Sequence, residues 1–215
     1  MQKKRTSTGL YDPSFEHDSC GVGFVCQLGG GASHGIVDDA LTMLEHMAHR
    51  GATGCEPDSG DGAGIMVRTP DAFLRRVCAA LSIDLPPHGQ YAVGMIFLPK
   101  DDAARRACEE VLEQVATGYG MRVLGWRDVP VDSAAVGPTP RRTEPRIRQV
   151  FISAGEGFYN RTDFDRRLYL VRQRAENVLE FGSLSAAARE DFYICILSAN
   201  RLVYKGMLTA EQLRR

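Results

Sequence analysis

The chain has 215 residues and a formal net charge of −1 at pH 7, and it is 44% hydrophobic and 25% charged. These values are typical of a soluble globular protein with one large domain or two small ones and a sizeable core. The balanced charge excludes an electrostatic argument for nucleic acid or a membrane surface as partner, and no run approaches the roughly 20 apolar residues of a membrane span.

The first 19 residues predict a leader rather than part of the folded unit. They begin with Met-Gln-Lys-Lys-Arg, but the residues that follow contain no apolar segment of the kind that a secretory signal peptide needs. The leader is therefore interpreted as a short propeptide. A disordered arm is the commoner alternative for a terminus of this composition.

Cys20 begins an apolar run spaced by glycines, Cys-Gly-Val-Gly-Phe-Val. The run predicts a buried strand over 21–28, closed by a glycine turn at 29–31. Cleavage before Cys20 would give one residue both a nucleophilic thiol and an α-amine, whose pKa of roughly 7.7–8.0 suits it to take up the thiol proton. Taken alone, a cysteine in an apolar run is more commonly a buried strand residue.

A helix is predicted from His34 to Arg50, because apolar residues recur there at helical spacing. Ser33 can cap its start, and Gly51 is the expected stop. The Arg50 guanidinium is a forked donor that suits a carboxylate or an amide oxygen. A basic residue at the end of a helix is also explained by the helix dipole alone.

A glycine-rich loop over 55–64 follows this helix and contains the run Gly60-Asp61-Gly62-Ala63-Gly64. Three glycines in five residues allow the backbone to approach a ligand or another segment closely. No Lys-Ser/Thr pair follows, as it would in a P-loop, and the spacing is not that of the dinucleotide fingerprint. A tight turn into the short strand predicted over 65–68 is the simpler interpretation.

The remaining chain alternates predicted helices and strands. Strands are expected over 91–98, 121–126 and 147–153, and helices are expected to start at Thr69-Pro70-Asp71, after Asp101, and over 163–180. Four prolines between 128 and 145 predict a loop or an extended crossover. Two β-rich runs, 192–197 and 201–207, are joined by Ser198-Ala199-Asn200, which predicts a hairpin, and Thr209 caps a further helix.

The cysteines are scattered, without a C-x-x-C pair or the Cys/His spacing of a zinc site, so no metal site is predicted. They are Cys20, Cys26, Cys55, Cys78, Cys108 and Cys195. Cys78 and Cys108 fall within helical patterns, where a free cysteine acts as a small core hydrophobe. Reduced thiols in a cytoplasmic protein are expected.

Each of these signals is weak alone, but their order and spacing resemble a known family. The Cys20-Gly-Val-Gly-Phe run, then His49-Arg50-Gly51-Ala52 and then 60–65 are similar to the start of the class II glutamine amidotransferase domain of the glutamate synthase large (alpha) subunit. The runs 192–198 and 203–208 look like the same family. The resemblance covers about residues 9–215.

The resemblance implies an α+β fold of the N-terminal-nucleophile hydrolase type, an αββα sandwich of two antiparallel sheets between helical layers. Residues 1–19 are then a propeptide, and 20–215 form the N-terminal part of the amidotransferase domain. Family members continue into a segment that carries a substrate-binding arginine and an Asn-Gly oxyanion hole, whereas this chain has no Asn-Gly dipeptide. We therefore expect the fold to be incomplete at its C-terminus and the chain as given to be weakly active or inactive.

The same resemblance implies a glutaminase reaction. Cys20 is expected to attack the side-chain amide of L-glutamine, with its own α-amine moving the proton. Arg50 and Gly51 match an arginine-glycine pair that lines the nucleophile pocket, and Asp61 and Gly62 match a loop near it. In the complete enzyme, ammonia would react with 2-oxoglutarate to form L-glutamate, with FMN and an iron–sulfur cluster in the remainder of the synthase and a small reductase subunit as a further partner; neither cofactor is expected in this chain.

Two other interpretations stay open. One is an amidotransferase domain that serves another acceptor, which the 60–64 and 203–208 runs disfavour. The other is a non-catalytic or regulatory module, which the missing oxyanion segment favours and the retention of Cys20 and Arg50 disfavours. The sequence does not indicate whether NADPH, NADH or ferredoxin is the electron donor.

Overall fold

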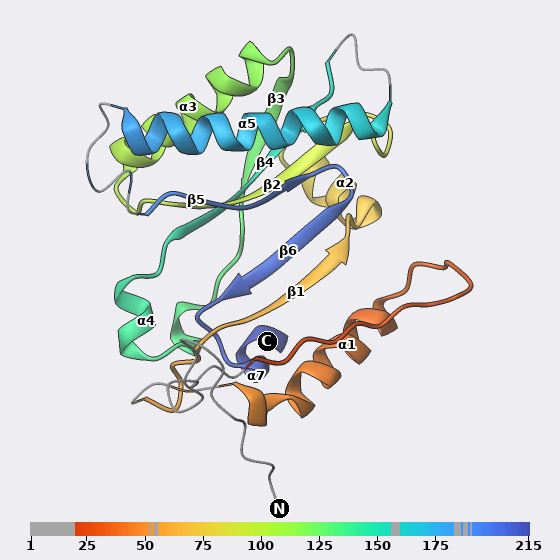
Figure 1. Cartoon of the computed structure of the whole chain (residues 1–215), viewed down its shortest axis with the longest axis vertical. Coiled ribbons are helices and arrows are strands. Elements are labelled where there is room, and N and C mark those ends of the chain that lie inside the picture. The colour runs from red at the N-terminus through yellow and green to blue at the C-terminus, as the bar shows by residue number, and fades with distance from the viewer. Residues whose placement is uncertain are drawn as a thin grey trace, which may run out of the picture.

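The computed structural model describes residues 20–51, 53, 56–155, 160–182, 186, 189 and 191–215, with only the backbone of residue 161. It contains a four-stranded sheet in the order β3-β4-β2-β5 and a two-stranded sheet, β1-β6 (Figure 1). All strand pairs within these sheets are antiparallel, and helices pack around them, so the α+β class is confirmed. The predictions for the leader, for residue 52 and for Cys55 lie outside the described residues.

The four-stranded sheet forms the centre of the larger part of the molecule. Its strands are β2 (Tyr91–Leu98), β3 (Arg122–Asp128), β4 (Arg146–Ser153) and β5 (Tyr193–Ser198). β2 is buried along nearly its whole length because both of its faces are covered. Ala92 and Ile96 belong to the core on one face, and Val93 and Met95 to the core on the other. The strands predicted at 91–98, 121–126 and 147–153 are confirmed.

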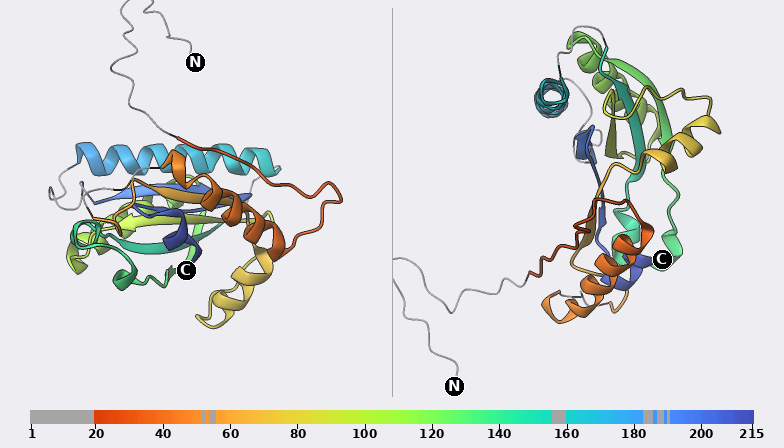
Figure 2. Two further views of the ribbon diagram at one scale, coloured as in Figure 1. Left: turned by 90° about the horizontal axis from the view of Figure 1, so that it is seen from below. Right: turned by 90° about the vertical axis from the view of Figure 1, so that its right-hand side faces the viewer.

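Two long helices, α3 (Asp102–Gly118) and α5 (Arg161–Phe181), cover one face of this sheet (Figure 2). The Asp101 carboxylate accepts a hydrogen bond from the Ala104 N–H at 2.8 Å, which caps α3. Leu112 of α3 and Phe164 of α5 are almost fully buried between the helices and the sheet. Burial of one such side chain stabilises the fold by about 1.5–3 kcal/mol.

The other face of the sheet packs against α2 (Asp71–Ala79) and β6 (Arg201–Gly206). Leu74, Cys78, Phe151 and Leu202 form the second core there. The Thr69 hydroxyl, expected to cap α2, instead donates to the Ala199 carbonyl oxygen at 3.3 Å, and Pro70 is the N-cap. The hydroxyl is thus used to join the start of α2 to the turn before β6.

The turn at 198–200 does not close the predicted hairpin. β5 pairs with β2, whereas β6 pairs with β1 (Ala63–Arg68), so the turn carries the chain from the large sheet to the small one. Asp165 of α5 holds this turn, because its carboxylate accepts hydrogen bonds from the Ala199 N–H, at 3.3 Å, and from the Asn200 amide. The hairpin prediction was wrong because the free edges of β2 and β1 each take one of the two strands.

The first helix, α1 (His34–His46), ends earlier than predicted and is followed by a single 3₁₀ turn, η2 (Ala48–Arg50), before Gly51. The final helix, α7 (Ala210–Arg214), begins at Thr209 with a capping box, as the sequence indicated. The predicted crossover between 128 and 145 contains η3 (Ser133–Ala135) and α4 (Pro138–Arg142). In the part of the chain that is described, no helix is long and apolar enough to cross a bilayer.

The strand predicted over 21–28 was wrong. These residues are irregular, and the exposed fractions of Val22, Phe24 and Leu28 are 88%, 86% and 99%. The turn lies one residue earlier than predicted, since the Gly30 N–H donates to the Gln27 carbonyl oxygen at 3.0 Å. A strand needs a neighbouring strand for its backbone hydrogen bonds, and this segment lies along α1 instead of along a sheet edge (Figure 1).

Candidate functional site

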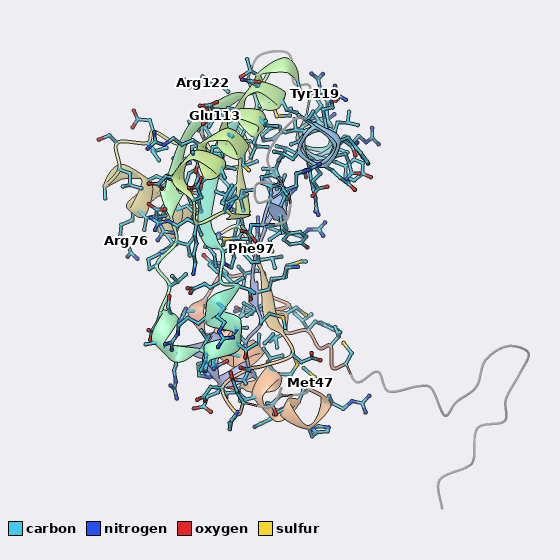
Figure 3. The ribbon with its side chains drawn as sticks, turned by 90° about the vertical axis from the view of Figure 1, so that its left-hand side faces the viewer. Met47, Arg76, Phe97, Glu113, Tyr119 and Arg122 are labelled. Carbon is cyan, nitrogen blue, oxygen red and sulfur yellow. The ribbon has the colours of Figure 1, made fainter. Side chains whose placement is uncertain are left out.

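The segment that starts at Cys20 lies against the C-terminal end of α1. A Cβ atom added to Gly21 would lie 3.1 Å from the Met47 Sδ atom and 3.3 Å from the Arg50 Cβ atom, so a larger residue here would require these side chains to shift by a few tenths of an ångström. Figure 3 shows Met47 at the end of the molecule away from Tyr119 and Arg122. The structure therefore brings the residue that follows Cys20 close to the side chains of Met47 and Arg50.

Arg50 and Gly51 are positioned by the 3₁₀ turn η2. The Arg50 N–H donates to the Met47 carbonyl oxygen at 2.8 Å, and the Gly51 N–H donates to the Ala48 carbonyl oxygen at 3.1 Å. Both residues and Cys20 are exposed. The predicted pair of a nucleophile and a guanidinium thus lies on an open part of the surface.

The loop that follows closes on itself before it reaches Asp61. Thr53 and Gly60 form an isolated antiparallel bridge, which brings the two ends of the loop together. Gly51 and Asp61 therefore both lie near this bridge. Gly62 has a φ of +134°, a conformation that favours glycine, and then the chain enters β1. Asp61 and Gly62 are exposed, and among the described residues no hydrogen bond or ion pair joins Asp61 to Cys20.

Glu56 fixes this loop to the crossover at α4. Its carboxylate accepts hydrogen bonds from the Ser59 hydroxyl at 2.7 Å, from the Thr139 N–H at 3.2 Å and from the Thr139 hydroxyl at 3.0 Å. The hydrogen bond from Ser59, followed by that from the Thr139 backbone, holds the pKa of Glu56 below its usual value. These hydrogen bonds therefore anchor the loop to α4.

Residues near the C-terminus contact the segments that lead to the predicted site residues, and sequence reasoning missed these contacts. Gly60 is buried against the backbone of Leu208 and Thr209, and Gln212 and Arg214 of α7 bond to the loop and to α1. The Thr209 cap was visible in the sequence as the start of a helix. Nothing in the spacing of residues indicated what that helix would contact.

Of the other cysteines, two that the structure describes lie in the core. Cys78 and Cys108 are fully buried, and burial raises the pKa of each thiol to about 11. The prediction that both act as small core hydrophobes is confirmed. Among the residues with described side chains, no three His, Cys, Asp or Glu residues are grouped so that they could hold a metal ion.

Comparison with known proteins relates the chain to one family. Residues 20–215 match the family described as "Glutamine amidotransferases class-II". The chain is 42% identical over 204 residues to the "Glutamate synthase [NADPH] large chain" of Bacillus subtilis, with 95% of this chain and 13% of that protein covered. It is 40% identical to the "Glutamate synthase [NADH]" of Saccharomyces cerevisiae, with 95% and 10% covered.

A plant protein extends this comparison. The chain is 39% identical to the "Ferredoxin-dependent glutamate synthase 1, chloroplastic/mitochondrial" of Arabidopsis thaliana, with 95% of this chain and 12% of that protein covered. The chain thus spans only a small part, 10–13%, of the length of these relatives. Their names differ in the electron donor although their similarity to this chain is nearly equal.

Proposed function

Because the chain belongs to the class-II glutamine amidotransferases, we propose that it releases ammonia from L-glutamine with Cys20 as the nucleophile. The observation that carries this proposal is the close approach of Gly21, the residue after Cys20, to the turn that carries Arg50. The family match that begins at residue 20 supports removal of the leader before Cys20.

Removal of the leader is the step that makes the cysteine reactive. A free α-amine has a pKa of roughly 7.7–8.0 and a thiol one of roughly 8.5, so proton transfer from the thiol to the amine costs little free energy. The thiolate then attacks the amide carbon, and the amine returns the proton to the departing ammonia. Water attacks the resulting glutamyl thioester, releasing glutamate and restoring the thiol.

The remaining predicted residues bind and orient the substrate in this proposal. The Arg50 guanidinium donates to an oxygen of the glutamine, and Gly51 lets the substrate approach the backbone. Asp61 and Gly62 border the pocket from the loop. The sequence contains no Asn-Gly pair, and loss of one oxyanion donor typically costs about 10²–10³ in rate. We therefore propose that the 215 residues alone turn over glutamine slowly.

The two sheets support the finer fold proposal. The large sheet is covered by α3 and α5 on one face, and β6 packs against its other face through Leu202. We propose that these are three of the four layers of the αββα sandwich, with β1 and β6 in the second sheet. The proposal places the domain boundary before Cys20.

The names of the relatives support glutamate synthase as the larger enzyme in which this domain acts. We propose that the ammonia passes to 2-oxoglutarate, that the rest of the synthase polypeptide and a reductase subunit are the partners, and that the enzyme acts in the cytoplasm. The described residues offer no cysteine group for an iron–sulfur cluster. We propose that FMN and an iron–sulfur cluster lie in the remainder of the synthase.

The test combines N-terminal mass spectrometry with labelling by a diazoketone analogue of glutamine. We expect the mature protein to start at Cys20 and the reagent to label Cys20 in preference to Cys26, which is also exposed and serves as an internal control. Cys20→Ala in the complete enzyme should abolish glutamine-dependent glutamate formation and leave ammonium-dependent formation intact. An intact leader on active protein, or equal labelling of both thiols, would contradict the proposal.

A further inference from the structure

We propose that α7 positions the glutamine pocket, with Gln212 and Arg214 as positioning residues that act through the loop at 56–62 and through α1. The inference rests on the proposed function, because it assigns these residues to the same site. Neither residue has a role in the reaction steps above. What distinguishes α7, which lies beside α1 in Figure 1, is that it bonds both to the loop that leads to Asp61 and to the helix that leads into the turn carrying Arg50.

Gln212 uses both ends of its amide group. Its Oε1 atom accepts a hydrogen bond from the Thr209 N–H at 2.8 Å, which caps the helix. Its Nε2 atom donates to the carbonyl oxygens of Asp58, at 2.9 Å, and Ala135, at 2.7 Å. One side chain thus joins α7 to the loop before Asp61 and to the crossover.

The backbone reinforces this connection. Asp58 also accepts a hydrogen bond from the Gly137 N–H at 2.9 Å, so the loop and the crossover are held together at the atom that Gln212 contacts. Gly60 lies so close to Leu208 that a Cβ atom on it would be 2.1 Å from the Leu208 carbonyl carbon. The position of Asp61 and Gly62, the next two residues, is therefore set by the entry to α7.

Arg214 makes the second connection, to α1. Its Nε and Nη2 atoms donate to the two carboxylate oxygens of Glu45, and Nη2 also donates to the Thr42 hydroxyl at 2.8 Å. A forked guanidinium that bonds both carboxylate oxygens fixes direction as well as distance. Because α1 leads directly into the turn that ends at Arg50, this pair sets the end of α1 relative to α7.

The short length and exposure of α7 indicate that its main structural role is to hold these segments. A helix of five residues is unstable alone, and none of its residues is buried, so it contributes little to either core. Its order comes from the hydrogen bonds to the loop, the crossover and α1. The same bonds hold the two sides of the pocket at a fixed separation.

This arrangement separates substrate recognition from thiol reactivity. Loosening α7 lets the loop and the end of α1 move apart, which weakens binding of a glutamine-shaped reagent. The Cys20 thiol keeps its own amine, so its reactivity toward a small reagent stays the same. A slower reaction of Cys20 with the glutamine-shaped reagent, at an unchanged rate with the small reagent, therefore indicates a positioning role.

The deciding variant is Gln212→Glu in the complete protein. It keeps the Oε1 acceptor and the chain length, and Thr-x-x-Glu is itself a good capping box. The Nε2 donor becomes an oxygen that faces two carbonyl oxygens, so both bridging hydrogen bonds are lost. The matched control is Glu211→Gln on the same helix, which removes only the exposed pair with Arg215.

Cys20 labelling is measured with the diazoketone analogue of glutamine and with iodoacetamide. For Q212E we expect the half-saturating concentration of the diazoketone to rise about tenfold, from the loss of two hydrogen bonds. The iodoacetamide rate should stay unchanged, and E211Q should match the unmodified protein on both reagents. Equal half-saturation for Q212E and E211Q would overturn the inference.

Two further observations keep the outcomes separate. If Cys78 and Cys108, which are buried, also become labelled in Q212E, this variant has unfolded. Arg214→Lys, which leaves Thr209 and Gln212 at the start of α7 unchanged, is then tested with the same two reagents. A raised half-saturating concentration for R214K supports the inference, and an unchanged one overturns it. Unselective labelling of Cys20 in the unmodified protein would refute the proposed function itself.

Discussion

Two glycines determine how closely the segments of the site approach one another. Gly21 lets the chain after Cys20 lie on Arg50, and Gly60 lets the loop lie on the backbone before α7. The neighbours of Gly21 are side chains that can shift by a few tenths of an ångström. The neighbours of Gly60 are backbone atoms at the start of α7. A larger side chain is therefore tolerated less well at Gly60 than at Gly21.

Gly60→Ala tests the closer of these contacts. The added Cβ atom would lie 2.1 Å from the Leu208 carbonyl carbon, and the backbone there can shift only if α7 shifts with it. We expect the free energy of unfolding to fall by about 3 kcal/mol, the upper end of overpacking costs. Urea denaturation measures it, with Gly29→Ala as control because no atom lies within 4 Å of the added Cβ there. A loss equal to that of the control would contradict the contact.

The buried thiols predict a pH dependence of stability. Burial raises the pKa of Cys78 and Cys108 from the ordinary 9.0 to about 11, so the folded state keeps protons that the unfolded state releases. The contribution of these two thiols to the free energy of unfolding is complete below pH 9, the ordinary thiol pKa, and is lost as the pH rises toward 11. We expect urea denaturation to show this fall between about pH 9 and 11.

The control for the pH dependence is Cys26→Ala, because Cys26 is exposed. The fall in unfolding free energy should be as steep in this variant as in the unmodified protein. It should be shallower when Cys78 and Cys108 are both replaced by alanine. The same slope in all three proteins would show that other groups cause it.

At the scale of elements, β1 and β6 place two like charges side by side. Arg68 and Arg201 are direct partners in the antiparallel register, and both are exposed. Directly opposite like charges are destabilising, by an amount in the range of about 0.2–1 kcal/mol. The pairing of the small sheet is therefore weaker than its length alone suggests.

Arg201→Glu should relieve this repulsion. We expect a gain of about 0.5–1 kcal/mol in the free energy of unfolding at low salt, which shrinks at high salt because exposed charges are screened. Arg122→Glu is the control, since Arg122 is an exposed strand residue that faces Ser153. Urea denaturation at two salt concentrations measures both. A gain for R201E that does not depend on salt would contradict the electrostatic explanation.

The elements that the sequence predicted well are those whose own residues decide their structure. β2 is a continuous apolar run between two covered faces, and α3 has both a capping aspartate and a strong apolar stripe. The strand predicted over 21–28 and the hairpin around 198–200 failed because a strand depends on its partner. Which edge accepts a strand is a tertiary property that local pattern does not contain.

The residues of the candidate site also divide into those that the sequence indicated and those that it did not. Cys20, Arg50 and the glycine loop could be selected from the sequence because family motifs mark them, and the structure brings Gly21 against Arg50. Gln212 could not be selected, since it acts through backbone carbonyls, which every residue carries. Where Asp61 lies relative to the substrate stays a prediction.

At the scale of the whole molecule, burial is distributed unevenly. α1 contains no buried residue, whereas every residue of β2 that precedes Phe97 is buried. Segments with few buried contacts open locally at a free energy below that of global unfolding. The half that carries the candidate site is therefore the less stable half.

Hydrogen exchange followed by mass spectrometry tests this difference. Amides of α1 should exchange at least about tenfold faster than those of β2 and α3, because they open without global unfolding. Adding the diazoketone analogue should slow exchange in α1 and leave β2 unchanged, which provides an internal control. Equal protection of α1 and β2 in the free protein would show that the molecule opens only as a unit.

The pairing of β1 with β6 also constrains the order in which the molecule folds. In the described part of the chain β1 has no other partner, and Thr69 at its end bonds to Ala199, which is 130 positions later. Closing so long a loop is slow, and a ribosome must release β6 before β1 can pair. The loop that leads into β1 thus lacks this anchor until the chain has been made through β6, and a shorter nascent chain has no finished pocket in which to consume glutamine.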